Sequence, residues 1–596
     1  MAPSGNESFV RAFWSCLFAG AVPVPLVMPA SWNKASPVLD RFAHASRRLG
    51  SPRVILDATA ANDPHIPPHV RARAVVLPRS RPDSHAFPLR EAVPDDTALI
   101  QFSSGSTGEP KGVVLTHRNV MTNLASMRAG IMLAPDDTVV SWMPLHHDFG
   151  LIGLLLGSIS CPNNVVLIET AAFVRRPLLW LDVLHAQGAT VTACPNFGQS
   201  LVLSRLDGTS AWDLSRLRVI LNGAEPISAR VMEAFCAALA PTGLRETAMF
   251  PVYGLAEATL AVTFSDLGAR PRLARCDRRS LRTGGSVREI EGTDPNALPV
   301  VSVGRPVQDC AVQIVDEDDR RLEDGTLGHV QVRGGNVMAG YYHDDESTAA
   351  AFHEGWLRTG DLGFIRDGLL FVTGRAKEVL FVNGENLYAH DIEQAAMQAA
   401  EGRRVAVTAW RNGDDESDRL LVFVASSQPE QDVGIFRAVE QRLASVFGLR
   451  PHAMIPLLSS RFPRTTSGKL QRHRLRERFD RGEFDEAARR LARALEDARA
   501  ETRVAPRNET ERLVHEVWAR ELGLRPHEFG THEPFEYLGG TSLVALLIVQ
   551  AIEDRSGVAL PFDVMRRRPT VAALAAHVDA LARLRLPDQR RGIFRG

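Results

Sequence analysis

Residues 102–114 read F-S-S-G-S-T-G-E-P-K-G-V-V, a loop rich in glycine and hydroxyl side chains that contains one lysine. The glycines let backbone amides turn inward, the hydroxyls donate neutral hydrogen bonds and the lysine supplies positive charge, which together predict a polyphosphate site. The residues concerned are Ser103, Ser104, Gly105, Ser106, Thr107, Gly108, Lys111 and Gly112. A Walker loop would place its lysine directly after the second glycine, whereas Glu109 and Pro110 intervene here. A plain solvent-exposed linker is disfavoured because strand-like runs flank the loop, at 97–102 and 112–116.

The bulk properties describe a multidomain protein of balanced charge. The chain has 596 residues, with 69 Lys and Arg against 70 Asp and Glu. That length suggests about three to five structural units. Because the net charge is −1 and no basic stripe with interleaved aromatics occurs, nucleic acid is not expected as a partner.

The cysteines and apolar segments indicate a cytoplasmic protein without a membrane span. Six scattered cysteines lack C-x-x-C spacing, so neither a zinc cluster nor a disulfide framework is predicted. The apolar N-terminal run resembles a signal peptide, but its prolines would break that helix. We expect instead a buried helix over 9–18 and a buried strand over 22–27. The apolar run 149–160 is too short to span a bilayer.

The pattern of apolar and charged residues along the sequence predicts an α/β fold followed by smaller domains. Strand-like and helix-like stretches alternate up to about residue 370, which favours multiple sheets covered by helices in a large domain over 1–375. A small α+β subdomain is expected over 376–475, and an Arg/Glu/Ala-rich helical linker over 476–506. Helical apolar periodicity predicts an all-α bundle over 507–584, before a tail at 585–596.

Further motifs follow the loop in a fixed order and resemble those of the adenylate-forming (acyl-activating) superfamily. The order is W-M-P-L-H-H-D-F-G-L-I-G from Trp142, N-G-A-E-P-I from Asn222, Y-G-L-A-E-A-T-L from Tyr253, T-G-D-L-G from Thr359, G-R-A-K from Gly374 and R-T-T-S-G-K-L-Q-R from Arg464. The resemblance covers nearly the whole chain to about residue 475. It implies ATP-dependent activation of a carboxylic acid as acyl-AMP.

Within that superfamily the sequences of these motifs are most similar to those of fatty acyl-AMP ligases. The segment 261–302 stands where those enzymes carry an insertion that disfavours transfer to coenzyme A. The resemblance therefore implies a fatty acid substrate and transfer of the acyl group to a carrier protein, in polyketide, nonribosomal peptide or lipid biosynthesis. Acyl pocket residues are expected to include Phe149, Ile152, Asn196, Phe197 and Gly198.

The same resemblance assigns roles to individual residues. A reaction that joins a carboxylate to a phosphate needs positive charge and metal at one point. The implied ligands of Mg²⁺ are Thr107 and Glu257, and Lys111 would contact the departing pyrophosphate. Lys469 would bridge the carboxylate and the phosphate, whereas His147 would act in proton transfer, bind a metal or only gate the acyl pocket. The other implied nucleotide contacts are Asp361 and Arg375 at the ribose, Gly223, Ala224 and Tyr253 at the adenine, and Glu225 and Gly254 beside them.

The C-terminal bundle carries the run E-Y-L-G-G-T-S-L from Glu536, which resembles the attachment site of acyl and peptidyl carrier proteins. Ser542 would begin a helix, and it is the implied site of covalent phosphopantetheine, although an ordinary helix N-cap fits the local sequence equally well. The implied partners are a phosphopantetheinyl transferase and downstream polyketide or nonribosomal peptide synthase modules, or other carrier proteins.

One departure from the family leaves alternatives open. Family members carry a further segment ahead of the region matching 9–25. The resemblance therefore implies that the start is misassigned, that the large domain is shortened, or that an upstream polypeptide supplies the rest. The alternatives to an acyl-AMP ligase are an acyl-CoA ligase and an inactive adenylation scaffold that presents the carrier.

Overall fold

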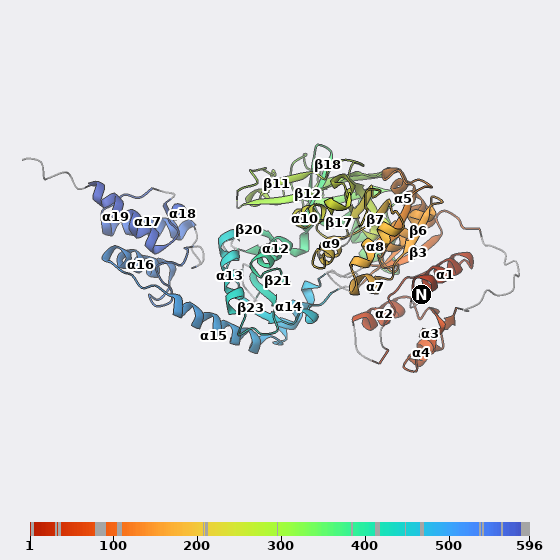
Figure 1. Ribbon diagram of the computed structural model, residues 1–596, viewed down its shortest axis with the longest axis horizontal. Coiled ribbons are helices and arrows are strands. Elements are labelled where there is room, and N and C mark those ends of the chain that lie inside the picture. The colour runs from red at the N-terminus through yellow and green to blue at the C-terminus, as the bar shows by residue number, and fades with distance from the viewer. Residues whose placement is uncertain are drawn as a thin grey trace, which may run out of the picture. The chain divides into compact units, whose positions relative to one another are not determined.

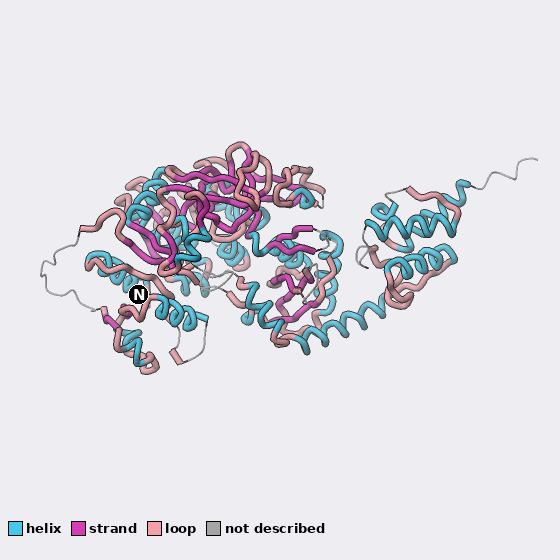
Figure 2. The backbone as a smooth tube through the Cα atoms, turned by 180° about the vertical axis from the view of Figure 1, so that it is seen from behind, coloured by secondary structure: helices cyan, strands magenta, loops and turns pink. Residues whose placement is uncertain are grey.

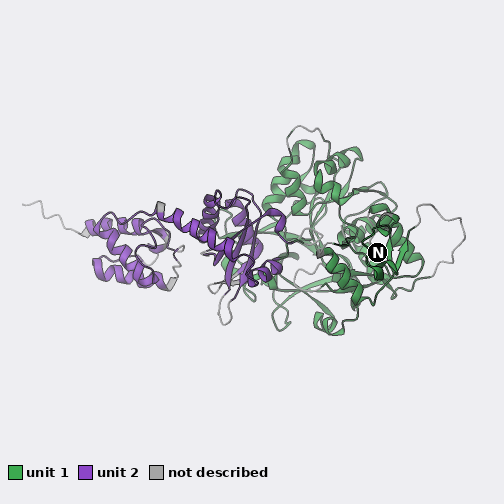
Figure 3. Cartoon of the chain, turned by 90° about the horizontal axis from the view of Figure 1, so that it is seen from below, with its two compact units in different colours: residues 1–379, 464–471 green, residues 380–463, 472–596 purple. Residues whose placement is uncertain are grey.

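The contacts of the computed structural model divide the chain into two compact units, coloured green and purple in Figure 3. Unit 1 comprises Met1–Val379 and Arg464–Gln471, and unit 2 comprises Leu380–Pro463 and Arg472–Gly596. The finer domain boundaries expected from the sequence stay predictions. The structure describes all residues except 2–4, 30–31, 34–36, 78–90, 104–109, 207, 209–211, 295, 383–384, 412–417, 448, 465–469, 536–537, 539–541, 562–563 and 586–596.

The main sheet of unit 1 has a parallel half of short, apolar strands (Figure 1). The strands are β5 (Thr138–Ser141), β6 (Asn164–Leu167), β7 (Val191–Ala193), β8 (Val219–Asn222) and β9 (Met249–Gly254). Neighbours pair in the order β9-β8-β7-β5-β6. β5, β7 and β8 are buried along their whole length, as expected of parallel strands covered on both faces. The helices that share their core are α8 (Leu178–Ala186), α9 (Asn196–Leu203) and α10 (Ala229–Leu239).

The same sheet continues into an antiparallel half that carries several candidate residues. Its strands are β10 (Ala261–Phe264), β12 (Ala297–Pro306), β18 (Leu369–Arg375), β17 (Trp356–Arg366), β14 (Gly328–Gly334) and β13 (Cys310–Val315), with β11 (Leu273–Asp277) and β16 (Phe352–His353) at the side. The segment 261–302 supplies β10, β11 and part of β12, so it forms part of this sheet.

A smaller sheet holds the two ends of the glycine-rich loop. It consists of β3 (Thr97–Phe102), β4 (Gly112–Thr116) and β15 (Gly340–Tyr341). The expected strands on both sides of the loop are thus confirmed. Phe102 lies opposite Gly112, so the chain leaves and re-enters the sheet at adjacent positions. A capping box between Thr116 and Asn119 then starts α5 (His117–Gly130).

The N-terminal segment confirms one expectation and corrects another. α1 (Asn6–Phe18) buries Phe9, Phe13 and Cys16, so the apolar run is part of the core. The strand expected over 22–27 is wrong, because this stretch is irregular. Pro23 and Pro25 have no N–H to donate to a ladder, and only isolated bonds form, such as that from the Ile100 N–H to the Pro23 carbonyl. Beyond it lie α2 (Pro37–Arg48), β1 (Val54–Leu56), α3 (Ala58–Ala61), α4 (Pro68–Arg71) and β2 (Ala74–Val76).

The remaining helices of unit 1 are short and connect the strands. They are the π-helix η1 (Phe149–Leu156), α6 (Gly157–Ile159), α7 (Thr170–Arg175), η2 (Ala240–Thr242), η3 (Glu246–Ala248), η4 (Ala256–Ala258), η5 (Arg278–Ser280), α11 (Asp345–Ala351) and η6 (Ala376–Glu378). The π-helix is notable because such i→i+5 turns are rare and occur often at functional sites.

Unit 2 begins with an α+β region. Its strands are β19 (Val379–Val382) with β20 (Glu385–Tyr388), and β21 (Val405–Trp410), β22 (Arg419–Ala425) and β23 (Ala453–Leu457); its helices are α12 (Ala389–Ala399), α13 (Val433–Phe447), η7 (Ser459–Arg461), α14 (Arg472–Asp480) and α15 (Asp485–Thr502). The charged helix α15 buries Leu491 and Leu495 in the core of this region. The Arg-rich stretch is therefore packed over part of its length, not only a solvated linker.

The rest of unit 2 is helical in its described residues, as the cyan tube in Figure 2 shows. The helices are α16 (Glu509–Leu522), α17 (Ser542–Ser556), α18 (Val564–Arg567) and α19 (Val571–Arg585). They share a core around Trp518, which is fully buried. Over the whole described chain, no helix is long and apolar enough to cross a membrane. All six cysteines are described, and each is unpaired.

Candidate active site

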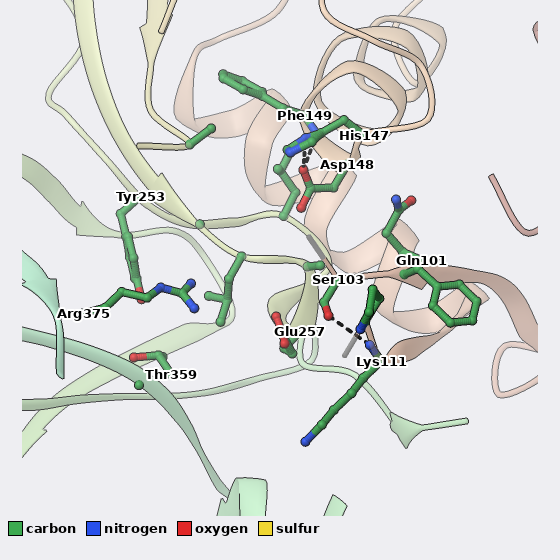
Figure 4. Close-up of a pocket in the computed structure, with 18 of the residues that line it drawn as sticks. Gln101, Ser103, Lys111, His147, Asp148, Phe149, Tyr253, Glu257, Thr359 and Arg375 are labelled. Atoms are coloured by element: carbon green, nitrogen blue, oxygen red, sulfur yellow. Dashed lines mark hydrogen bonds and ion pairs between the residues drawn. The ribbon is translucent and has the colours of Figure 1, made fainter. Parts of the chain in front are cut away.

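A cavity of about 910 Å³ opens in unit 1 beside the start of β4. Figure 4 shows three groups of side chains around it: one with Tyr253, Arg375 and Thr359, one with Ser103, Lys111 and Glu257, and one with His147, Asp148 and Phe149. The predicted site residues that line this cavity are Ser103, Lys111, His147, Ala224, Tyr253, Gly254, Glu257 and Arg375. Residues from distant parts of the sequence therefore meet at one place.

The first group forms a closed network of charge and hydrogen bonds. Asp361 and Arg375 lie opposite each other on β17 and β18, with 3.1 Å between the carboxylate oxygen and the guanidinium Nε. The Tyr253 hydroxyl donates to the other Asp361 oxygen at 2.6 Å. Burial, and then the Asp361 charge and hydrogen bond, raise the pKa of Tyr253 well above its usual value, so its hydroxyl stays a donor. Asp361 is also the main cause that raises the pKa of Arg375. The result is a fixed, buried carboxylate beside Tyr253 and Arg375, which line the cavity, whereas Asp361 itself is not among the lining residues.

Two glycines, Gly223 directly after β8 and Gly254 at the end of β9, lie closer to neighbouring backbone than a side chain would allow. A Cβ on Gly223 would lie 2.8 Å from the Val252 carbonyl oxygen, and one on Gly254 would lie 1.9 Å from the Leu260 carbonyl oxygen. Ala224 has a φ of +68°, an uncommon conformation for a residue with a side chain. The two glycines therefore permit this close packing, and Ala224 and Gly254 line the cavity, which Gly223 does not.

Glu225 is not among the residues that line the cavity. Its Oε1 accepts a hydrogen bond of 2.7 Å from the Phe197 N–H, close to the beginning of α9. This geometry gives Glu225 a part in holding α9 and no direct contact with the cavity.

The second group contains the positive and negative charges next to the loop. The Lys111 N–H donates to the Ser103 Oγ at 3.1 Å, and the Ser103 N–H donates to the Lys111 carbonyl at 2.9 Å, so the ends of the loop are tied together. Glu257 lies on the short helix η4 and accepts a hydrogen bond of 3.0 Å from the Tyr341 hydroxyl. The Lys111 Nζ lies 4.9 Å from the centre of the Tyr341 ring. Sequence reasoning missed Tyr341, although it is the second residue of the run G-Y-Y at 340–342.

The third group surrounds the start of the π-helix. His147 Nδ1 lies 2.5 Å from Asp148 Oδ1, and the Phe149 N–H donates to the same carboxylate at 2.7 Å. His146, beside them, is buried, and burial followed by the charges of His147 and Arg41 lowers its pKa to about 3. His146 is therefore neutral near pH 7. His147 is held by its own neighbour, Asp148, and lines the cavity next to Phe149 in the sequence.

The far part of the cavity is apolar. It is lined by Met127, Ile131, Phe149, Gly153, Leu260 and Phe264, which come from α5, η1 and the region of β10. Of the pocket residues expected from the sequence, only Phe149 is among those that line it. Ile152 lies in η1, the helix that also contains Phe149, whereas Phe197 and Gly198 lie in α9, where Asn196 donates to the Pro226 carbonyl at 2.5 Å. No sequence signal marks the real lining, because it depends on which helix faces meet.

Several predicted residues cannot be placed. Ser104, Gly105, Ser106, Thr107, Gly108 and Lys469 lie outside the described residues. Ser542 is the first residue of α17, as expected, and its side chain is not among those described.

Comparison with known families identifies the two parts of the chain. Residues 6–342 match the model of the AMP-binding enzymes, and residues 512–578 match that of the phosphopantetheine attachment site. The chain belongs to the AMP-binding enzyme family and is an adenylate-forming ligase joined to a carrier domain. The predicted fold class, a large α/β adenylation domain with a C-terminal carrier bundle, is confirmed.

Individual relatives agree with this assignment. The 4-hydroxyphenylalkanoate adenylyltransferase of Mycobacterium tuberculosis is 34% identical over 525 residues, which cover 81% of this chain and 82% of the relative. The long-chain-fatty-acid–AMP ligase FadD32 of Mycolicibacterium smegmatis is 30% identical over 533 residues, with 80% and 83% covered. Among solved structures, McyG A-PCP complexed with phenylalanyl-adenylate has a TM-score of 0.80 and 26% identity, covering 97% of this chain and 88% of that one.

Enzymes of this family use ATP and Mg²⁺, and phosphopantetheine attachment domains carry that group covalently. The described residues fit a magnesium ion that arrives with its nucleotide. They contain no group of three or more His, Cys, Asp or Glu side chains suited to a resident metal. Instead, the carboxylates that line the cavity near Lys111 include Glu257 and Asp344. Mg²⁺ is commonly held by one or two carboxylates together with substrate phosphates and water.

Proposed function

We propose that this protein activates a fatty acid as acyl-AMP and transfers the acyl group to a phosphopantetheine thiol on Ser542. The observation that carries this proposal is that one cavity is lined at one side by Tyr253, Arg375 and Glu257, and at the other by the apolar side chains around Gly153. A polar nucleotide and an aliphatic chain can therefore meet within it. The family resemblance supports the same substrate class.

In the first step a carboxylate oxygen of the acid bonds to the α-phosphorus of ATP, and the bond to the departing pyrophosphate breaks. Asp361, fixed by Arg375 and Tyr253, would accept hydrogen bonds from the ribose hydroxyls. Ala224, Gly223 and Tyr253 would form the adenine slot. These contacts orient the nucleotide before the reaction, which lowers the entropic part of the barrier.

The charged groups would act on the phosphates. Lys111, with Ser103 and the loop residues 104–108, would bind the departing pyrophosphate, and Lys469 would bridge the acid and the α-phosphate. Glu257 and Thr107 would hold Mg²⁺, which supplies positive charge to the phosphates when bound. His147 would gate the entrance to the apolar part, since Asp148 fixes its ring and both His147 and Phe149 line the cavity.

In the second step the acyl group would pass from AMP to a thiol, which phosphopantetheine would supply when bound, with release of AMP and of the thiol proton. The acceptor would be the group attached to Ser542, at the start of α17. A phosphopantetheinyl transferase would attach this group, and downstream synthase modules or other carriers would receive the acyl chain. With six unpaired cysteines, a reducing cytoplasm is the compartment that we propose.

Two variants of the full chain test the two steps separately. Acid-dependent exchange of labelled pyrophosphate into ATP reports the first step, and intact-protein mass spectrometry of the phosphopantetheinylated chain reports the second. Ser542→Ala should exchange like the unaltered chain and gain no acyl mass. Lys469→Ala should lose exchange while its circular dichroism spectrum stays unchanged. Exchange that is absent with every acid would reject adenylation, and acyl loading of Ser542→Ala would reject the carrier assignment.

A further inference from the structure

Tyr341 lies between two opposite charges of the cavity, those of Glu257 and Lys111. Its hydroxyl donates to Glu257 Oε1 at 3.0 Å, while its ring centre lies 4.9 Å from the Lys111 ammonium nitrogen. No ion pair joins Lys111 directly to Glu257, although both are described and both line the cavity. A single side chain therefore contacts the anion with its polar end and the cation with its aromatic face.

The backbone holds Tyr341 in this place from three directions. Tyr341 lies opposite Val113 in the pairing of β15 with β4, two residues after Lys111. Its N–H donates to the Thr348 Oγ1 at 2.9 Å. On the other side, the Met338 N–H donates to the Glu257 carbonyl at 2.8 Å, which ties the strand to η4. The ring is thus fixed relative to both charged residues by short connections within unit 1.

The contacts of Tyr341 affect how Lys111 and Glu257 interact before a nucleotide binds. An ammonium and a carboxylate that share a cavity attract each other, and a direct ion pair would neutralise both. The phenol ring offers Lys111 a cation–π contact, and the hydroxyl satisfies one oxygen of Glu257. Glu257 keeps its other oxygen for a cation, and the ammonium group stays directed by a weak contact that phosphate can replace.

We propose that Tyr341 is a positioning residue that keeps Glu257 and Lys111 apart, so that the carboxylate is available to a divalent cation and the ammonium to phosphate. This inference rests on the proposed function of the cavity and adds a residue to it. The proposal assigns Tyr341 two separate contacts, one made by its hydroxyl and one made by its ring. The hydroxyl serves the metal side, and the ring serves the phosphate side.

The two parts can be tested by two substitutions of the full chain. Tyr341→Phe removes the hydroxyl and keeps the ring, whereas Tyr341→Leu removes both. Tyr342→Phe is the matched control, because Tyr342 is the neighbouring, half-buried tyrosine, its ring lies against His343, and its hydroxyl has no hydrogen-bond partner among the described residues. All three should keep the far-ultraviolet circular dichroism spectrum of the unaltered chain.

The direct readout is the binding of Mn²⁺ in the presence of ATP and without acid, measured by electron paramagnetic resonance. Tyr341→Phe loses one hydrogen bond to a charged group, and we expect this loss to weaken Mn²⁺ binding about tenfold to thirtyfold. The KM for ATP at saturating Mg²⁺ should stay within about twofold. Tyr341→Leu should weaken Mn²⁺ binding by the same factor and in addition raise that KM about threefold. Tyr342→Phe should change neither quantity.

Two results would overturn the inference: Mn²⁺ affinity of Tyr341→Phe equal to that of the unaltered chain, or an equal loss in Tyr342→Phe. If the proposed function is wrong, a different result is expected: the unaltered chain would show no acid-dependent pyrophosphate exchange. The Mn²⁺ measurement contains no acid and does not depend on that exchange, so it still decides the role of Tyr341.

Discussion

The nucleotide side and the apolar side of the cavity are built in different ways. On the nucleotide side, Asp361 is fixed by two partners, Arg375 on the neighbouring strand β18 and Tyr253 on the more distant strand β9 of the same sheet. On the apolar side, the space depends on the absence of a side chain: a Cβ on Gly153 would lie 2.8 Å from Leu260 Cδ2 and 3.2 Å from Phe149 Cδ2. One side is thus determined by paired polar groups and the other by shape, so the two should respond differently to substitution.

The largest effect is expected from filling the apolar side. Gly153→Val should narrow the passage between Phe149 and Leu260 and reduce kcat/KM for dodecanoate about 100-fold, with little change for butyrate, because only a long chain must pass this point. Pyrophosphate exchange with both acids measures this. Gly157→Ala is the control, since a Cβ there meets only the Ile152 carbonyl, at 3.4 Å. An equal loss for both acids would indicate general damage and contradict the shape argument.

The next effect is expected on the nucleotide side. Asp361→Ala removes a buried carboxylate and leaves Arg375 and Tyr253 without their partner. We expect the KM for ATP to rise roughly 30-fold, about 2 kcal/mol, which is below the cost of breaking a fully buried pair because Arg375 is partly exposed. The loss should be the same for every acid. Asp367→Ala, which affects an exposed carboxylate paired with Arg272, should leave the KM unchanged.

A smaller effect is expected from removing one hydrogen bond of the same network. Tyr253→Phe keeps the ring and loses the hydroxyl that donates to Asp361. The KM for ATP should rise about fivefold, near 1 kcal/mol, the usual value for one hydrogen bond. A steady-state titration of ATP at saturating acid measures it. A rise in the KM for ATP as large as that of Asp361→Ala would contradict this expectation, because the geometry assigns the Tyr253 hydroxyl only one of the contacts of Asp361.

The smallest expected effect is the coupling between the two sides. The neighbours of Gly153 and the hydrogen-bond partners of Asp361 are different residues. The double variant Gly153→Val with Asp361→Ala should therefore lose activity by the product of the single losses, within about twofold. A larger deviation in pyrophosphate exchange would mean that the two sides do not act independently.

This difference also explains what the sequence could predict. The strands around the glycine-rich loop, and the meeting of Lys111, Tyr253, Glu257 and Arg375, follow from motifs in which residue identity carries the chemistry. The lining by Met127, Ile131 and Phe264 could not be predicted, because ordinary core residues become pocket residues only when α5, η1 and β10 leave a space between them. Tyr341 was missed for a related reason: its contacts are set by strand pairing with β4.

The strand expected over 22–27 is absent because of its prolines. Its apolar residues favour a strand, but two prolines remove donors that a ladder needs, and the stretch stays irregular although parts of it are buried. Conversely, α15 looks like a solvated linker in composition, and only its spacing of Leu491 and Leu495 allows it to pack.

The central claim is that one cavity brings ATP and an aliphatic acid together. Its most direct test is acid-dependent pyrophosphate exchange by the unaltered chain over a series of straight-chain fatty acids of increasing length. The account predicts exchange whose kcat/KM rises from butyrate to dodecanoate as more of the apolar side is filled. Exchange that is absent for every acid, or equal for all of them, would contradict it.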